Sequence, residues 1–193
     1  MSDVCSVLLA GVGGQGILLA SNIIAGAALL AGHDVKTNEV HGMAQRGGSV
    51  VAEIRYGGKV RSPLIGMMGA HALAAFEQME ALRYAQYLTP GGLAVVSKLR
   101  IVPAMVSSGH GKYPEDIEDR LRKAFRNLHY LDTAAAAERS GSPRAGNLVV
   151  LGALSKGLDL PETLWEKAIT KCVKPEFVSM NVLAFNLGRQ MVA

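Results

Sequence analysis

The chain has 193 residues, of which 49% are hydrophobic and 19% charged, and this composition excludes a disordered polypeptide. A chain of this length forms one ordinary domain and buries about 70% of its unfolded surface, so its core needs no disulfides or metal ions. The net charge of +4 comes from scattered Lys and Arg residues that do not alternate with aromatic residues, so no nucleic-acid surface is predicted.

The chain contains two cysteines, Cys5 and Cys172, which stand far apart in the sequence. Neither has a second cysteine at the spacing of a zinc or iron–sulfur site, and Cys5 lies in an apolar run where a thiol should be inert. The first residues lack a basic segment ahead of an apolar one, and the longest apolar stretch, residues 17–31, is shorter than the ~20 residues of a membrane span. We expect a soluble, cytoplasmic chain.

The first elements predict the start of an α/β unit. Residues 4–10 form a short apolar run with valines, typical of a strand that is buried on both faces. This run leads into a glycine turn (residues 11–16). Residues 17–31 are apolar on almost every side and end at Gly32, which predicts a core helix.

A second strand is predicted at residues 33–40, and a second loop (residues 41–49), rich in glycine and polar residues, follows it. Residues 50–56 carry β-branched side chains, a Gly-Gly pair comes next, and residues 59–62 can return as a short strand. This pattern predicts a β-hairpin and therefore a mixed sheet.

The rest of the chain continues as helices and strands. The expected elements are a strand at 71–76, a helix at 77–88, a turn at 90–92, a strand at 93–97, an amphipathic helix at 115–128, a brief strand at 130–131, an alanine-rich helix capped by Asp132, and helices at 147–158, at 162–173 after Pro161 and at 176–191. No repeat, low-complexity tract or linker interrupts them.

The glycine turn is the first candidate site. Gly11, Gly13 and Gly16 have the spacing G-x-G-x-x-G between a strand and a helix, where backbone amides at the positive end of the helix dipole can bind phosphate or another anion. Alternatively, the same glycines only make a tight turn that packs the helix on the sheet. A dinucleotide site would also need an acidic residue, for which Glu39 is in range, followed by a second crossover helix; a loop and a hairpin follow instead.

The second loop is the second candidate site. It places His41, Gln45, Arg46 and Ser49 among glycines, and Arg46 could hold a carboxylate or phosphate with help from backbone amides. The alternative is that Arg46 pairs with Glu39 and that His41 caps a turn. If the strands before the two loops are neighbours, both loops face the same edge of the sheet, where ligands of open α/β sheets usually bind.

Several segments together resemble a known family. They are LLAGVGGQGILLAS, NEVHGMAQRGGSVVAEIR, RSPLI, AAFEQMEALRYAQYLTPGG and NLVVLGALSKGL, and they extend over nearly the whole chain. The chain resembles the gamma-type subunits of 2-oxoacid:ferredoxin oxidoreductases, most of all the beta subunits of the indolepyruvate branch. The segment EVHGMAQRGGS is the most distinguishing one, since relatives that oxidise pyruvate or 2-oxoglutarate tend to carry other residues there.

The resemblance implies a three-layer α/β/α fold with a mixed sheet and a single gamma-type domain over residues 1–193. It implies a subunit that is inactive alone and works in a complex that converts a 2-oxoacid and coenzyme A to acyl-CoA and carbon dioxide, with electrons passing to ferredoxin. Thiamine diphosphate with Mg and the iron–sulfur clusters are expected on a larger partner subunit, and none on this chain alone. No nucleic acid or membrane partner is implied, and the isolated chain could form a homodimer through the surface meant for its partner.

The family's two signature segments match the glycine turn and the second loop. The corresponding residues are Gly11, Gly13, Gly14, Gln15, Gly16, His41, Gly42, Met43, Gln45, Arg46 and Gly47. The resemblance implies that both segments face the partner near its cofactor, with no catalytic residue and no metal ligand among them. Three alternatives stay open: a gamma subunit for pyruvate, 2-oxoisovalerate or 2-oxoglutarate, a stand-alone nucleotide-binding Rossmann-like module, and a purely structural role of both loops.

Overall fold

The computed structural model describes residues 4–41, 47–102 and 112–192. These residues form a six-stranded sheet in the order β2-β3-β1-β4-β5-β6. The strands are β1 (Cys5–Val12), β2 (Asp34–His41), β3 (Ser49–Gly57), β4 (Ala70–Ala75), β5 (Leu88–Ser97) and β6 (Asn127–Leu131). Strands β1, β4, β5 and β6 are parallel, and β3 runs antiparallel to its neighbours β1 and β2. The predicted mixed sheet is confirmed.

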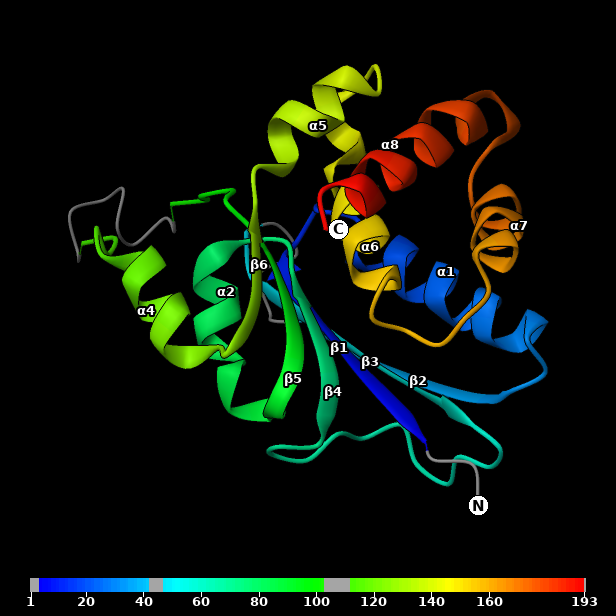
Figure 1. The fold of residues 1–193 in the computed structure, drawn as a ribbon, viewed down its shortest axis with the longest axis horizontal. Coiled ribbons are helices and arrows are strands. Elements are labelled where there is room, and N and C mark those ends of the chain that lie inside the picture. Colours follow the sequence, from blue (N-terminus) through cyan, green and yellow to red (C-terminus); the bar gives the residue numbers. More distant parts are fainter. Residues whose placement is uncertain (1–3, 42–46, 103–111, 193) are drawn as a thin grey trace.

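Helices cover both faces of this sheet and make the three-layer fold. The helices are α1 (Ile17–Leu30), α2 (Gln78–Arg83), α4 (Ile117–Ala124), α5 (Thr133–Arg139), α6 (Gly146–Ser155), α7 (Glu162–Cys172) and α8 (Val178–Gln190), with short 3-10 turns η1 (Ala85–Tyr87), η2 (Pro143–Ala145) and η3 (Pro175–Phe177). Figure 1 shows α1, α6, α7 and α8 on one side of the sheet and α2 and α4 on the other. In the part of the chain that the structure describes, no helix is both long enough and apolar enough to cross a bilayer.

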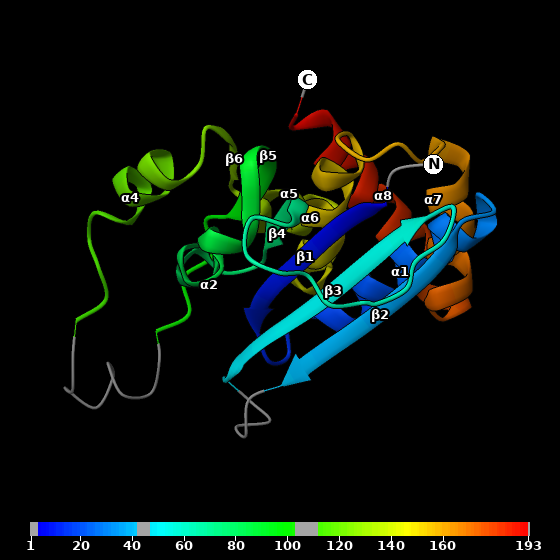
Figure 2. The same cartoon turned by 90° about the horizontal axis from the view of Figure 1, so that it is seen from below.

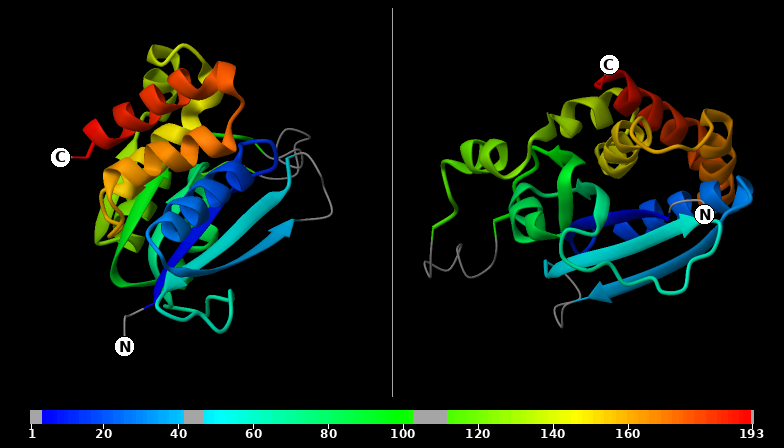
Figure 3. Two further views of the ribbon diagram at one scale, coloured as in Figure 1. Left: turned by 90° about the vertical axis from the view of Figure 1, so that its right-hand side faces the viewer. Right: turned by 60° about the horizontal axis from the view of Figure 1, so that its bottom comes forward.

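The alternation of side chains along β1 divides the interior into two cores. Val7 and Leu9 point into the larger core, which α1 and α6 to α8 complete, and Leu8 and Ala10 point into the smaller core beneath α2 and α4. All four are at least 99% buried, as expected of a strand with helices on both faces. In the left panel of Figure 3, α1 lies between strands β2 and β3 and the C-terminal helices.

The predicted hairpin is wrong in its pairing. The antiparallel partners of β3 are β1 and β2, and residues 59–62 form no strand. The Val60 amide donates instead to the Asp34 carboxylate at 2.8 Å, and the Arg55 guanidinium donates to the Ser62 carbonyl oxygen at 3.0 Å. These contacts hold the connection between β3 and β4 across the sheet, as Figure 2 shows, so this segment does not pair at the edge.

Other predicted elements occur with changed limits. The helix expected at 77–88 divides into α2 and η1, and the residues expected to turn at 90–92 belong to β5, where the pairing with β4 is irregular and Gly91 has a φ of 82°. The amphipathic helix ends at Ala124, because Phe125 is already extended before β6. Asp132 caps α5 as predicted, its carboxylate accepting from the Ala135 amide at 3.3 Å.

Helices α6 and α8 cross at two glycines. A Cβ on Gly152 would overlap the backbone carbonyl of Phe185, and a Cβ on Gly188 would overlap that of Val149. Neither obstacle is a side chain that could rotate away. The close approach of these two helices therefore requires glycine at both positions.

Candidate functional site

The glycine turn connects β1 to α1 through two left-handed backbone conformations. Gly14 has a φ of 99° and Gly16 a φ of 76°, and both values strongly favour glycine. A Cβ on Gly16 would also overlap the side-chain amide of Asn147 in α6, whereas nothing lies within 4 Å of a Cβ on Gly14. The turn is therefore closed on the α6 side and open where Gly14 faces the cavity described below.

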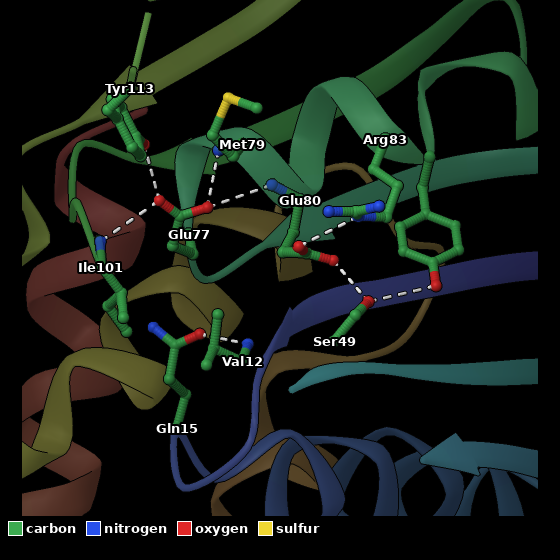
Figure 4. Close-up of polar contacts among 10 residues, drawn as sticks. Val12, Gln15, Ser49, Glu77, Met79, Glu80, Arg83, Ile101 and Tyr113 are labelled. Carbon is green, nitrogen blue, oxygen red and sulfur yellow. Dashed lines mark hydrogen bonds and ion pairs between the residues drawn. The ribbon is translucent and has the colours of Figure 1, made fainter. Parts of the chain in front are cut away.

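Gln15 stabilises the turn through its side-chain amide. Its Oε1 accepts from the Val12 amide at 2.7 Å (Figure 4). Its Nε2 donates to the Phe76 carbonyl oxygen at 2.7 Å. A Cβ on Gly11 would come within 2.7 Å of that Oε1, so glycine at this position leaves room for the bridge. Gln15 thus links the glycine turn to the end of β4, a contact that the spacing of the motif does not predict.

A cavity of about 330 Å³ opens beside the glycine turn. The N-terminal ends of α1 and α6 both line it, and neither helix has a side-chain cap. Ser97 and Thr133, whose hydroxyls are 2.6 Å apart, form the far wall together with the exposed Arg144. Uncapped amides, hydroxyls and a guanidinium are groups that bind anions.

The second loop meets the glycine turn at the sheet edge. Strands β1 and β2 are separated by β3, contrary to the expected neighbours, but both run in the same direction and end at the same edge. The Gly13 amide donates to the Gly48 carbonyl oxygen at 2.9 Å, which joins the two segments directly. Among the predicted loop residues, His41 ends β2 and Gly47 has a φ of 77°, whereas Gly42, Met43, Gln45 and Arg46 lie outside the described residues.

Two buried carboxylates at the start of α2 complete this edge, and they were not predicted from the sequence. Glu77 is 1% exposed and Glu80 is 5% exposed. The Glu80 carboxylate accepts from the Ser49 hydroxyl at 2.5 Å and pairs with Arg83 at 3.1 Å (Figure 4). A cavity of about 150 Å³ lies against these groups and against Gly47 of the second loop. The sequence signal that could have identified Glu77 is its position, because it is an acidic residue directly after an apolar strand and at the start of a helix.

Asn147 and Tyr113 were also missed. Asn147, buried at the start of α6, donates to the Gly16 carbonyl oxygen at 3.4 Å, and only the tertiary fold brings these residues together. The Tyr113 hydroxyl donates to the Glu77 carboxylate at 2.7 Å. Burial raises the pKa of this hydroxyl above its ordinary value, and the bond to Glu77 raises it further, so Tyr113 remains a donor throughout the neutral range.

The described residues offer no metal site. Among them, no group of three or more His, Cys, Asp or Glu residues could hold a metal ion. Cys5 and Cys172 are free thiols, and burial raises the pKa of both above the ordinary value of 9.0. The polar groups that the structure describes at this edge are backbone amides, hydroxyls, carboxylates and the guanidinium groups of Arg83 and Arg144.

The comparison with protein families identifies the chain. The sequence profile of the pyruvate ferredoxin/flavodoxin oxidoreductase family matches residues 6–191. The chain belongs to this family. The match includes both signature segments and extends into the last helix, so the family resemblance predicted from the sequence is confirmed.

Several proteins are similar to this chain over nearly its whole length. The indolepyruvate oxidoreductase subunit IorB of Archaeoglobus fulgidus is 42% identical, over 95% of this chain and 92% of its own length. The 2-oxoglutarate synthase subunit KorC of Methanothermobacter thermautotrophicus is 30% identical, over 96% of this chain and 94% of its own. The solved structure of a keto/oxoacid ferredoxin oxidoreductase gamma subunit from Geobacter sulfurreducens has a TM-score of 0.69 at 25% identity and covers 97% of both chains. This chain is a small subunit of a 2-oxoacid oxidoreductase complex.

Proposed function

We propose that this chain serves a complex that oxidises indolepyruvate or another arylpyruvate to the acyl-CoA and carbon dioxide, with ferredoxin as electron acceptor. The support is the difference in identity between two relatives that match it over similar lengths. The indolepyruvate oxidoreductase subunit is 42% identical and the 2-oxoglutarate synthase subunit 30% identical. A subunit for pyruvate, 2-oxoisovalerate or 2-oxoglutarate is the alternative within the family.

The glycine turn and the second loop are proposed to face the larger subunit close to its cofactor. One observation carries this assignment: the bond from the Gly13 amide to the Gly48 carbonyl oxygen places both segments side by side at one sheet edge. There the turn presents backbone amides, and Arg46 and Gln45 of the second loop would add polar contacts to the partner. In this arrangement residues 1–193 act as one gamma-type domain.

The cofactors are proposed to reside on the partner. Thiamine diphosphate with Mg would supply the decarboxylation chemistry, and iron–sulfur clusters would supply the electron path to ferredoxin. The described part of this chain does not fit these groups, since it has no set of metal ligands and its cysteines are two isolated thiols. Coenzyme A enters as cosubstrate, and the cavity beside the glycine turn offers amides and Arg144 to its phosphate groups.

A stand-alone nucleotide-binding module is the second candidate function. The observation that favours it is the cavity at the uncapped ends of α1 and α6. Against it stands the antiparallel β2–β3 pair, which takes the place of the second crossover helix of a dinucleotide-binding fold. A thermal-shift measurement with NAD, FAD and ADP separates the two, because a ligand at about 100 times its Kd stabilises by about 2.7 kcal/mol. Our proposal predicts no shift of the isolated chain with NAD or FAD, and at most a small shift with ADP, which shares its diphosphate with coenzyme A.

The experiment that tests the substrate is an anaerobic assay of the complex made by co-expressing this chain with its larger subunit. Coenzyme A-dependent reduction of a viologen dye is measured with indolepyruvate, phenylpyruvate, pyruvate and 2-oxoglutarate, each with and without this chain. The proposal predicts turnover of the arylpyruvates only when both chains are present. Preference for 2-oxoglutarate or pyruvate would replace the substrate assignment and leave the subunit role intact.

A further inference from the structure

We infer that Glu77, the residue that caps α2, and Glu80, in the first turn of α2, are positioning residues that hold three segments, at Ser49, Ile101 and Tyr113, in one fixed arrangement for the reaction. Figure 4 shows the Glu77 carboxylate directed toward Ile101 and Tyr113 and the Glu80 carboxylate directed toward Ser49. The inference rests on the proposed function in one respect, namely that this edge of the sheet faces the reaction site of the complex.

The Glu77 carboxylate binds more groups than a helix cap requires. Its Oε2 accepts from the amides of Met79 at 2.6 Å and Glu80 at 3.1 Å, which is ordinary capping of α2. Its Oε1 accepts in addition from the Ile101 amide at 3.3 Å and from the Tyr113 hydroxyl at 2.7 Å. One side chain therefore ties two further segments, 24 and 36 residues away in sequence, to the start of α2.

Glu80 connects the same helix to the second loop. Its carboxylate accepts from the hydroxyl of Ser49, the first residue of β3, and the Gly48 carbonyl before it accepts from the Gly13 amide. Two residues before α2 begins, the Phe76 carbonyl accepts from the Gln15 side-chain amide. The glycine turn and Ser49 are thus joined twice, directly through Gly13 and Gly48 and also through residues 76–80.

Burial makes this arrangement sensitive to small changes. A buried carboxylate is costly unless hydrogen bonds compensate for its lost hydration, and here the compensating bonds include groups from three distant segments, at Ser49, Ile101 and Tyr113. Chains of such bonds behave as a unit, so shortening one member displaces the others. Capping alone would be satisfied by aspartate, which is also a favoured residue at the start of a helix.

The test is the variant Glu77→Asp in the complex with the larger subunit. Aspartate keeps the cap of α2 but is one methylene too short to reach Ile101 and Tyr113 as well. We expect a fall in kcat of about 10-fold or more, because misplacement of about 1 Å can cost 100-fold, with subunit affinity and KM unchanged. The matched control is Glu118→Asp, an exposed carboxylate in the first turn of α4, which should leave turnover unchanged.

Amide hydrogen exchange in the isolated chain separates this inference from the proposed function. Glu77→Asp should speed exchange of the Ile101 amide about 10-fold while that of the Ala81 amide, inside α2, stays near wild type. If the wild-type chain adds no activity to the larger subunit, the proposed function fails and exchange alone decides whether Glu77 holds these segments. Unchanged kcat in an active complex, or unchanged exchange at Ile101, would overturn the inference. If Glu77→Asp does not fold, Tyr113→Phe removes one of the bonds without touching the cap; a lower kcat supports the inference and wild-type kcat refutes it.

Discussion

Replacement of Gly16 by alanine tests the described geometry of the glycine turn. Gly16 precedes α1 with a φ of 76°, a conformation that costs a residue with a Cβ about 1–2 kcal/mol. The new methyl group would also overlap the Asn147 amide and displace its bond to the Gly16 carbonyl oxygen, at a further cost of about 1 kcal/mol. Alanine also restricts the unfolded chain more than glycine does, which offsets the loss of stability by about 0.4–1 kcal/mol. We therefore expect a net loss of about 2 kcal/mol.

The matched control is Gly32→Ala. Gly32 has a φ of 85°, and nothing lies within 4 Å of a Cβ there, so this variant carries the backbone strain without the steric contact. Urea unfolding should give Gly16→Ala a loss about 1 kcal/mol greater, which corresponds to roughly 2–4 °C in Tm for a chain of this size. Addition of Asn147→Ala to Gly16→Ala should recover part of that difference. Equal losses for the two glycine variants would refute the contact between the glycine turn and α6.

Three further predictions concern stability and reactivity. Gly188→Ala should lower the free energy of unfolding in urea by about 3 kcal/mol or more, because its Cβ would overlap the backbone of α6. Gly26→Ala, whose Cβ would meet only a methyl group at 3.5 Å, should raise it by about 0.5–1 kcal/mol. The reverse order of stability would contradict the packing of α6 on α8. Cys5 and Cys172, with raised pKa values, should react with iodoacetamide at pH 8 more slowly than glutathione does, and a fast thiol in mass spectrometry would count against their burial. The pKa of Asp34 lies below its ordinary value of 3.8, because the Val60 backbone amide and then Lys36 favour the charged carboxylate. The contribution of Asp34 to stability is therefore present above that value and is lost as the pH falls, so Asp34→Asn should make stability depend less on pH in acid unfolding. Identical acid unfolding curves for the variant and the wild type would show that these contacts contribute nothing.

Much of the fold follows from local sequence patterns. The apolar run of β1, the apolar helix α1 and the turn between them were predictable because each pattern is continuous and long. The partner of β3 was not predictable, because residues 59–62 have the composition of a strand and are held elsewhere by distant contacts, including bonds to the side chains of Asp34 and Arg55. The pairing of strands depends on such distant contacts.

The candidate site was predictable in its backbone and not in its buried side chains. The spacing of Gly11, Gly13 and Gly16 indicates a special turn by itself, and Gly14 and Gly16 adopt left-handed conformations there that few other residues adopt. Glu77 and Glu80 read as ordinary helix residues, and their role appears only when Tyr113, 36 residues after Glu77, comes into contact. The second loop was found from its glycines and polar residues, whereas the expectation of a partner came from the family resemblance, because composition and periodicity do not contain it.

The most direct test of the account is titration of the purified chain into its larger subunit under anaerobic conditions. Coenzyme A-dependent oxidation of indolepyruvate is followed by viologen reduction as the amount of this chain increases. We expect a rate that rises from near zero and saturates once every larger subunit is paired. A rate that is already maximal without this chain, or that stays at zero with an excess of it, would contradict the claim that the chain completes an arylpyruvate oxidoreductase.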